Sequence, residues 1–164
     1  MKFTETDLRL AVNHVAFDMF HFRFYAERYS KYQSNTEHRA CHQAMIYSLL
    51  LHFRVLLHFF YGTPRNDDCC AEHFRILSGF EVEFPPSIHA RPLWEEEVRV
   101  HLNKRLAHIT ATRWTENPPP MNYFVARFNE VLHLIQRFEA ALPGEVGQHF
   151  RDKMNVWDAH YCHL

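Results

Sequence analysis

The stretch AMIYSLLLHFRVLLHFFYG, from Ala44 to Gly62, decides the fold of this 164-residue chain. The helix that it predicts is apolar on nearly every side, which is typical of the most buried helix of a bundle. The stretch is also long enough to cross a bilayer. However, it contains His52, Arg54 and His58, and ionisable groups are rare in the middle of such spans. We therefore expect a buried helix from about residue 36 to 61 and no membrane span.

Further segments have the apolar spacing of helices. Residues 4–32 carry apolar side chains at alternating steps of four and three, and residues 121–142 repeat these steps without a break. A third long helix is expected over residues 93–114, a short one over residues 67–76, and an amphipathic one at the C-terminal end. The pattern predicts an all-α fold, namely an up-and-down four-helix bundle with a short inserted helix and a C-terminal helix.

The core of this bundle is predicted from the same spacing. The expected seams are Leu8, Val12, Val15, Met19, Phe22, Ala26 and Tyr29 in the first helix, and Phe124, Phe128, Val131, Ile135, Phe138 and Leu142 in the fourth. In the first helix Phe17, Phe20 and Phe24 form a second stripe, so its buried face is expected to be broad. The three acids that open the third helix, Glu95 to Glu97, suit its positive N-terminal end.

Composition narrows the functional classes. The chain is expected to form one domain, residues 1–164, with 4 Gly and a formal net charge of −1. So few glycines exclude a Gly-rich nucleotide loop, and the near-zero charge excludes a strongly basic nucleic-acid surface. No cofactor is expected. The chain opens without an apolar leader and its four Cys match no zinc or redox spacing, so reduced thiols and a cytoplasmic location are expected.

A metal-binding helical enzyme remains an alternative, because the chain has 14 His. His38 and His42 have the i, i+4 spacing of a chelating pair, and Glu130 and His133 form one Glu-x-x-His pair. A di-metal carboxylate bundle needs two such pairs and two further Glu. Chance scatter of 14 His explains the spacing that is present, so no metal ligands are predicted.

The segment NKRLAHIT, from Asn103 to Thr110, lies in the third predicted helix. Steps of about 100° per residue, taken from an inward-facing Leu102, divide its polar side chains into two flanks. One flank holds His101, Arg105 and His108, and the other holds Asn103, Ala107 and Thr110. An imidazole can accept a proton from a hydroxyl and a guanidinium can hold a phosphate, so the first flank is able to do chemistry. The alternative is an ordinary solvated helix flank.

NKRLAHIT, followed by Arg113, resembles a motif of a bacterial branch of the HEPN superfamily. In that branch an Asn-Lys pair precedes Ala-His, a hydroxyl residue and a downstream Arg. The upstream DDCCAEHF and the proline-containing loop before the third helix resemble the branch as well. The similarity is detailed over about residues 55–115 and extends to most of the chain as a helix pattern. HEPN domains are helical bundles that commonly dimerise, and many are metal-independent endoribonucleases of defence and toxin–antitoxin systems.

The resemblance implies a site. It assigns catalysis to His108, Asn103 and Arg105, and substrate binding to Lys104, Thr110, Arg113 and His101. His108 would act as base or acid, and the 2′-hydroxyl of RNA would be the nucleophile, so neither a metal nor a cofactor is needed. The implied partners are a second copy of the chain, an RNA substrate and an antitoxin or other protein.

A non-catalytic reading of the same resemblance stays open. The family hallmark is an Arg followed, after four to six residues, by a His, and Asn103 stands where that Arg would precede His108. The hallmark spacing also occurs between Arg127 and His133. The amide at position 103 and the near-zero net charge favour a HEPN-like bundle that binds a partner protein or nucleic acid without cleaving it.

Overall fold

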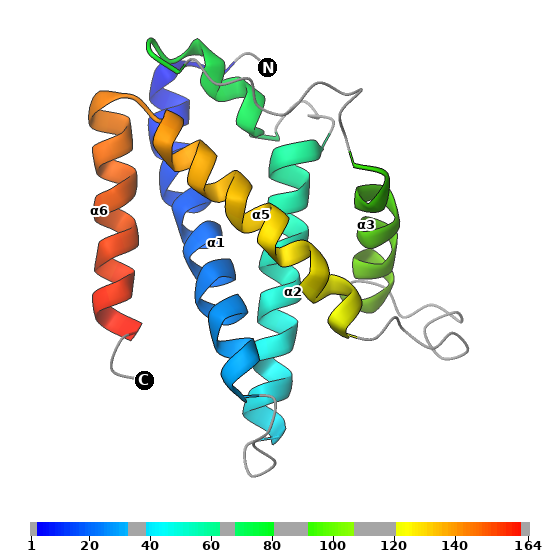
Figure 1. Ribbon diagram of the computed structural model, residues 1–164. Coiled ribbons are helices and arrows are strands. Elements are labelled where there is room, and N and C mark those ends of the chain that lie inside the picture. The colour runs from blue at the N-terminus through cyan, green and yellow to red at the C-terminus, as the bar shows by residue number, and fades with distance from the viewer. Residues whose placement is uncertain (1–2, 33–38, 63–67, 81–91, 107–120, 162–164) are drawn as a thin grey trace.

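The computed structural model describes residues 3–32, 39–62, 68–80, 92–106 and 121–161 of the chain. All regular structure among these residues is helical (Figure 1). The elements are α1 (Glu5–Tyr32), α2 (Arg39–Tyr61), the 3-10 helix η1 (Ala71–Ile76), α3 (Leu93–Leu106), α5 (Met121–Ala141) and α6 (Gly144–Tyr161). The predicted all-α bundle, with its short insert and C-terminal helix, is confirmed.

The helix α2 lies at the centre of the arrangement. It packs against α1, α3, α5 and η1, while α6 packs against α1 and α5. Figure 1 shows α5 crossing obliquely over α1 and α2, with α3 and α6 on opposite sides of that pair. By length and composition His42–Tyr61 is one helix that could cross a membrane, and half of its apolar window is buried against the rest of the protein, as in a core helix.

The predicted core is largely confirmed. Every seam residue of the first and fourth predicted helices is buried except Ala26, which is partly buried. Phe17 differs from the expectation, because 43% of its surface is exposed while Phe20 in the same stripe is 1% exposed. Glu95 lies in the first turn of α3, as predicted, and its side chain is 0% exposed.

The ring of Phe138 on α5 is the hub of the aromatic core. Its centroid lies 5.2 Å from that of Phe59 on α2, 5.0 Å from Phe74 on η1 and 6.2 Å from Phe150 on α6, each in an edge-to-face arrangement. Such pairs add to the free energy of burial, so one side chain ties four elements together.

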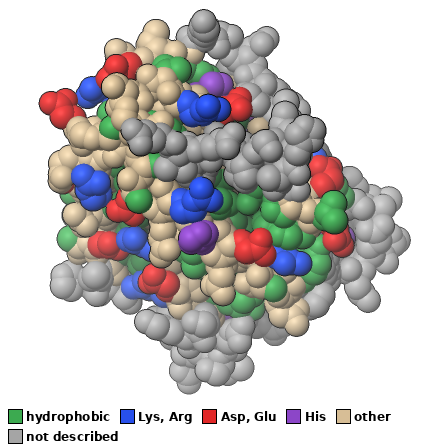
Figure 2. All heavy atoms as spheres, turned by 45° about the horizontal axis from the view of Figure 1, so that its top comes forward, with side chains coloured by type: hydrophobic (Ala, Val, Ile, Leu, Met, Phe, Trp, Pro, Cys, Tyr) green, Lys and Arg blue, Asp and Glu red, His purple; other side chains and the backbone are tan. Residues whose placement is uncertain are grey.

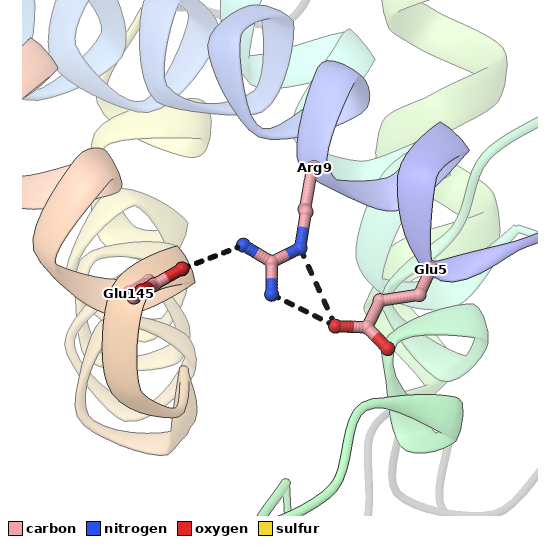
Figure 3. Close-up of polar contacts among 3 residues, drawn as sticks. All are labelled: Glu5, Arg9 and Glu145. Carbon is pink, nitrogen blue, oxygen red and sulfur yellow. Dashed lines mark hydrogen bonds and ion pairs between the residues drawn. The ribbon is translucent and has the colours of Figure 1, made fainter.

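The starts of α1 and α6 are joined by an exposed ion-pair cluster (Figure 3). The guanidinium of Arg9 lies between two carboxylates, with Nη2 2.9 Å from Glu5 Oε1 and Nη1 3.3 Å from Glu145 Oε2. Only Leu142 and Pro143 separate α5 from α6, and Gly144 opens α6 with a φ of +44° that side-chain-bearing residues seldom adopt. The N-terminal end of α6 is thus fixed to both α1 and α5.

The short inserted helix is shorter than predicted. We expected Asp67 and Asp68 to begin it, but η1 begins at Ala71 with Cys70 as the N-cap. The backbone N–H of Cys70 donates to Nδ1 of His73 at 2.9 Å, which replaces the acidic start that the sequence suggested. The expected continuation of the third helix from 107 to 114 lies outside the described residues.

Replacing Phe138 with alanine tests the role of the aromatic hub. We expect Phe138→Ala to lower the free energy of unfolding by about 3–5 kcal/mol, because it leaves a cavity shared by four elements. Chemical denaturation measures this loss. The control is Leu93→Ala, since Leu93 is 98% exposed and its loss should change stability by less than about 0.5 kcal/mol. Equal effects of the two variants would contradict the assignment.

Candidate active site

A polar groove lies between α2 and α3, which we call the α2–α3 groove. Its volume is about 380 Å³, and its lining residues are Arg54, Val55, His58, Asp68, Arg99 and Asn103. On α2, Arg54 and His58 are four residues apart. On α3, Arg99 and Asn103 have the same spacing. Since side chains at i and i+4 lie one turn apart on the same face, each helix presents a pair of polar groups to the groove.

A hydrogen bond between the two helices orients the cation of α2. Nε of Arg54 donates to Oδ1 of Asn103 over 2.6 Å. Within the described part of the chain, Arg54 makes no other polar contact, so its two Nη groups stay available for a ligand. A guanidinium held by one nitrogen and open at the other two can bind a phosphate or carboxylate through two parallel hydrogen bonds.

An Asp–His pair lies beside this guanidinium. Nε2 of His58 is 3.1 Å from Oδ2 of Asp68, and the side chains are 44% and 30% exposed. Because the carboxylate accepts, a neutral His58 carries its hydrogen on Nε2 and its lone pair on Nδ1. A partly exposed imidazole oriented by a carboxylate is a suitable general base.

Gly62 makes room for the ring of His58. A Cβ at position 62 would lie 2.5 Å from Nδ1 of His58 and 2.3 Å from the backbone oxygen of the same residue. Glycine therefore closes α2 where any larger residue would push the imidazole away.

The second cation of the groove is held by two acids of its own helix. Arg99 donates to Glu96, and its Nε lies 3.6 Å from Oε1 of the buried Glu95. The hydrogen bond with Glu96, together with the charges of both acids, raises the pKa of Arg99 above its usual value. Arg99 thus stays positive and is already partly neutralised.

The structure describes only part of the site predicted from the sequence. Two side chains of the predicted flanks are described, and they face different helices: His101 lies 5.8 Å from the ring of Tyr123 on α5, whereas Asn103 bonds to Arg54 of α2. His108, Thr110 and Arg113 lie outside the described residues. Lys104 and Arg105 belong to α3, but their side chains are likewise outside what the structure describes.

The sequence did not predict four polar groove residues, Arg54, His58, Asp68 and Arg99, as parts of a site. Arg54 and His58 count in the sequence as charges that argue against a membrane span, and Asp68 as the start of a helix. The i, i+4 spacing of Arg54 with His58, and of Arg99 with Asn103, was the available signal.

The other candidates from the sequence do not gather into sites among the described residues. Arg127 pairs with Glu130 at 3.1 Å, and Glu130 also accepts from the indole of Trp94 at 2.8 Å, while His133 is exposed on the same helix. Over the described ranges no group of three or more His, Cys, Asp or Glu side chains could hold a metal ion, and His38 lies outside those ranges.

The cysteines that the structure describes are unsuited to nucleophilic chemistry. Cys69 and Cys70 are both free thiols. Burial raises the pKa of Cys69 to about 11 and, with help from the charge of Asp68, that of Cys70 to about 12. Both thiols therefore stay protonated and unreactive at neutral pH.

Comparison of the chain with models of known families, with curated proteins and with solved structures finds no match.

Replacing Gly62 tests the close approach beneath His58. We expect Gly62→Ala to lower the free energy of unfolding by about 1–3 kcal/mol, because the added methyl group overlaps the imidazole and the backbone. Chemical denaturation measures stability, and the NMR shifts of the His58 ring should move as well. The control is Ser78→Ala at an exposed turn. Unmoved His58 signals in the glycine variant would refute the positioning role of Gly62.

Proposed function

We propose that the α2–α3 groove binds the phosphodiester of RNA, and that the chain is a HEPN-like domain that cleaves RNA without a metal. One observation carries the proposal: Arg54 of α2 bonds to Asn103, the residue that occupies the arginine position of the HEPN motif. The missing guanidinium thus enters from the neighbouring helix, one turn before His58. The i, i+4 spacing supports joint action of these two groups on one ligand.

The proposed reaction uses the nucleophile within the RNA. His58 takes the proton from the 2′-hydroxyl at Nδ1 while Asp68 holds the ring and stabilises the imidazolium. The 2′-oxygen then attacks phosphorus, and the bond from phosphorus to the 5′-oxygen breaks. Arg54 and Arg99 balance the charge on the phosphoryl oxygens. The products are a 2′,3′-cyclic phosphate and a 5′-hydroxyl.

The leaving 5′-oxygen needs a proton, and we assign this step to His108. Five positions separate it from Asn103, and it is the HEPN histidine by resemblance. Lys104, Arg105, Thr110 and Arg113 remain proposed phosphate contacts, since they share that segment.

We also propose a cytoplasmic location, where such an RNA substrate is found.

The charge around the groove favours a second candidate function, binding without cleavage. Glu95, Glu96 and Asp68 lie close to the two groove cations, so the local charge is near zero. On the face shown in Figure 2, Lys and Arg side chains alternate with Asp and Glu among the atoms described there. Such a surface contacts nucleic acid only locally, and a partner protein fits it equally well.

Cleavage and binding of fluorescent single-stranded RNA separate these candidates. We expect His58→Gln and His108→Ala to slow cleavage by about 10²–10⁴-fold, as loss of a general acid or base does, with little change in affinity. EDTA should have no effect on cleavage.

We expect Arg54→Gln to weaken RNA binding about tenfold or more, whereas Arg151→Gln on the exposed side of α6 should not. Cleavage that persists in both histidine variants would show that this site is wrongly assigned, and binding without cleavage supports the second candidate.

An apolar stripe next to the groove supports the proposed homodimer. Tyr47, Leu51 and Val55 recur every four residues along α2 and are 38%, 46% and 38% exposed, and Val55 also lines the groove. An exposed row of large apolar side chains on a helix commonly packs against a partner. We propose a second copy of the chain as that partner, with an antitoxin as the alternative.

Sedimentation measurements test this pairing. We expect the protein to sediment as a dimer and Leu51→Glu to sediment as a monomer, because burying an unpaired carboxylate opposes association. Val156→Glu is the matched control, since Val156 is exposed on α6. A wild-type monomer at high concentration, or a Leu51→Glu dimer, would contradict the proposal.

A further inference from the structure

Two imidazoles and one carboxylate form a buried cluster where α1 meets α2. His21 and His52 are 6% and 8% exposed, and their rings stack with centroids 5.2 Å apart. Nδ1 of His52 donates to Oδ1 of Asp18 at 2.8 Å, and Nδ1 of His21 donates to the backbone oxygen of Phe17 at 2.9 Å. The α2–α3 groove uses none of these groups, so the cluster has no role in the function proposed above.

The C-terminal half of α6 rests on this cluster. The rings of Trp157 and Tyr161 lie 6.2 Å and 5.6 Å from that of His21. The same two rings lie 5.7 Å from Phe20. An imidazole enclosed by aromatic rings in this way is accommodated easily only while it is neutral.

The charged and titratable groups around His21 leave an added proton poorly compensated. Asp18 and Tyr25 face it from α1, His52 from α2 and Tyr161 from α6, and the only carboxylate among them already accepts from His52. The pair of Arg23 with Asp158, at 2.9 Å, lies further along the same interface. The side chain of His160 lies outside the described residues.

A second proton on His21 would have to enter at Nε2, because Nδ1 is engaged with Phe17. No described residue accepts from Nε2. Burial lowers the pKa of His21 below its ordinary value of 6.5 and outweighs the hydrogen bond to Phe17, which raises it. The charge of His52 lowers the pKa further, and that of Asp18 raises it slightly.

The other end of α6 is held by contacts of a different kind. Arg9 bridges to Glu145 (Figure 3), and Val146 and Phe150 are buried in the core. The hydrogen bonds to Glu5 and Glu145 raise the pKa of Arg9, so this guanidinium stays positive in mild acid. His149 at this end is exposed and bonds only at the surface, to Asn13 at 3.0 Å. Mild acid therefore acts mainly on the C-terminal half of the helix.

We propose that the contact of His21 with Trp157 and Tyr161 is an acid-sensitive latch, and that protonation of His21 detaches the C-terminal half of α6 from α1. Above pH 6.5 His21 is neutral in both the attached and the detached forms, so pH has no effect. As pH falls below 6.5, the detached form takes up a proton that the attached form resists. The equilibrium constant for detachment then rises by up to tenfold per pH unit, until pH passes the lowered pKa of the attached form. Detachment uncovers the ring of Phe20, which is 1% exposed in the attached form.

Hydrogen exchange of the full chain at pH 7.5, 6.5 and 5.5, corrected for the intrinsic exchange rate, tests the latch. We expect the amides of residues 155–161 to lose protection by up to about fivefold between pH 6.5 and 5.5, while residues 146–150 keep theirs. His21→Phe keeps an aromatic ring but cannot titrate, so its protection should not change with pH. His149→Gln, on the exposed side of the same helix, should behave as the wild type.

Two results would overturn the latch. One is an equal loss of protection in His21→Phe and the wild type, and the other is a loss spread evenly over residues 146–161. If His21→Phe does not fold, His52→Gln provides the comparison, because removing the neighbouring imidazole, which lowers the pKa of His21, should make the acid effect smaller. An undiminished effect in His52→Gln would then count against the proposal.

Discussion

The burial of α2 is the constraint on which both the fold and the candidate site depend. This helix packs against four other elements, yet its apolar stretch from Ala44 to Tyr61 includes three basic side chains, His52, Arg54 and His58. Burial near such groups is tolerated only when each finds a polar partner. His52 finds Asp18 on α1, Arg54 finds Asn103 on α3, and His58 finds Asp68 before η1. The side chains that argue against a membrane span are therefore the ones that link α2 to its neighbours and shape the groove.

The fold was predictable because apolar spacing reports directly on burial. The unbroken repeat in residues 121–142 gave a helix whose predicted seam is buried at every position. The spacing did not reveal the environment of two side chains, Glu95 and Phe17. Glu95 lies seven residues, or about two turns, before the buried Leu102 and shares its buried face, which its role at the helix start did not reveal. Phe17 lies at the outer edge of α1, where it covers His21 and Trp157 instead of entering the core.

The site was less predictable, because it depends on the register between two helices. A helical wheel places Asn103 on one flank of α3, but it cannot say that Arg54, 49 positions earlier, faces that flank. Local spacing also cannot show that Asp68, which lies outside any helix, turns back to His58 on α2. The resemblance drew attention to α3, which forms one side of the groove, while Arg54 and the Asp–His pair join it only through tertiary packing.

The two-residue connection between α5 and α6 has a mechanical consequence. Pro143 has a fixed φ, Gly144 holds a turn of positive φ, and a Cβ on Gly147 would lie 2.4 Å from the backbone oxygen of Leu142. The N-terminal end of α6 thus has little freedom to translate, and the helix can move chiefly by pivoting. At about 1.5 Å per residue the 18 residues of α6 span about 27 Å, so a rotation of about 20° displaces the far end by about 9 Å. A small rotation about the N-terminal end of α6 therefore produces a large displacement of Trp157 and Tyr161.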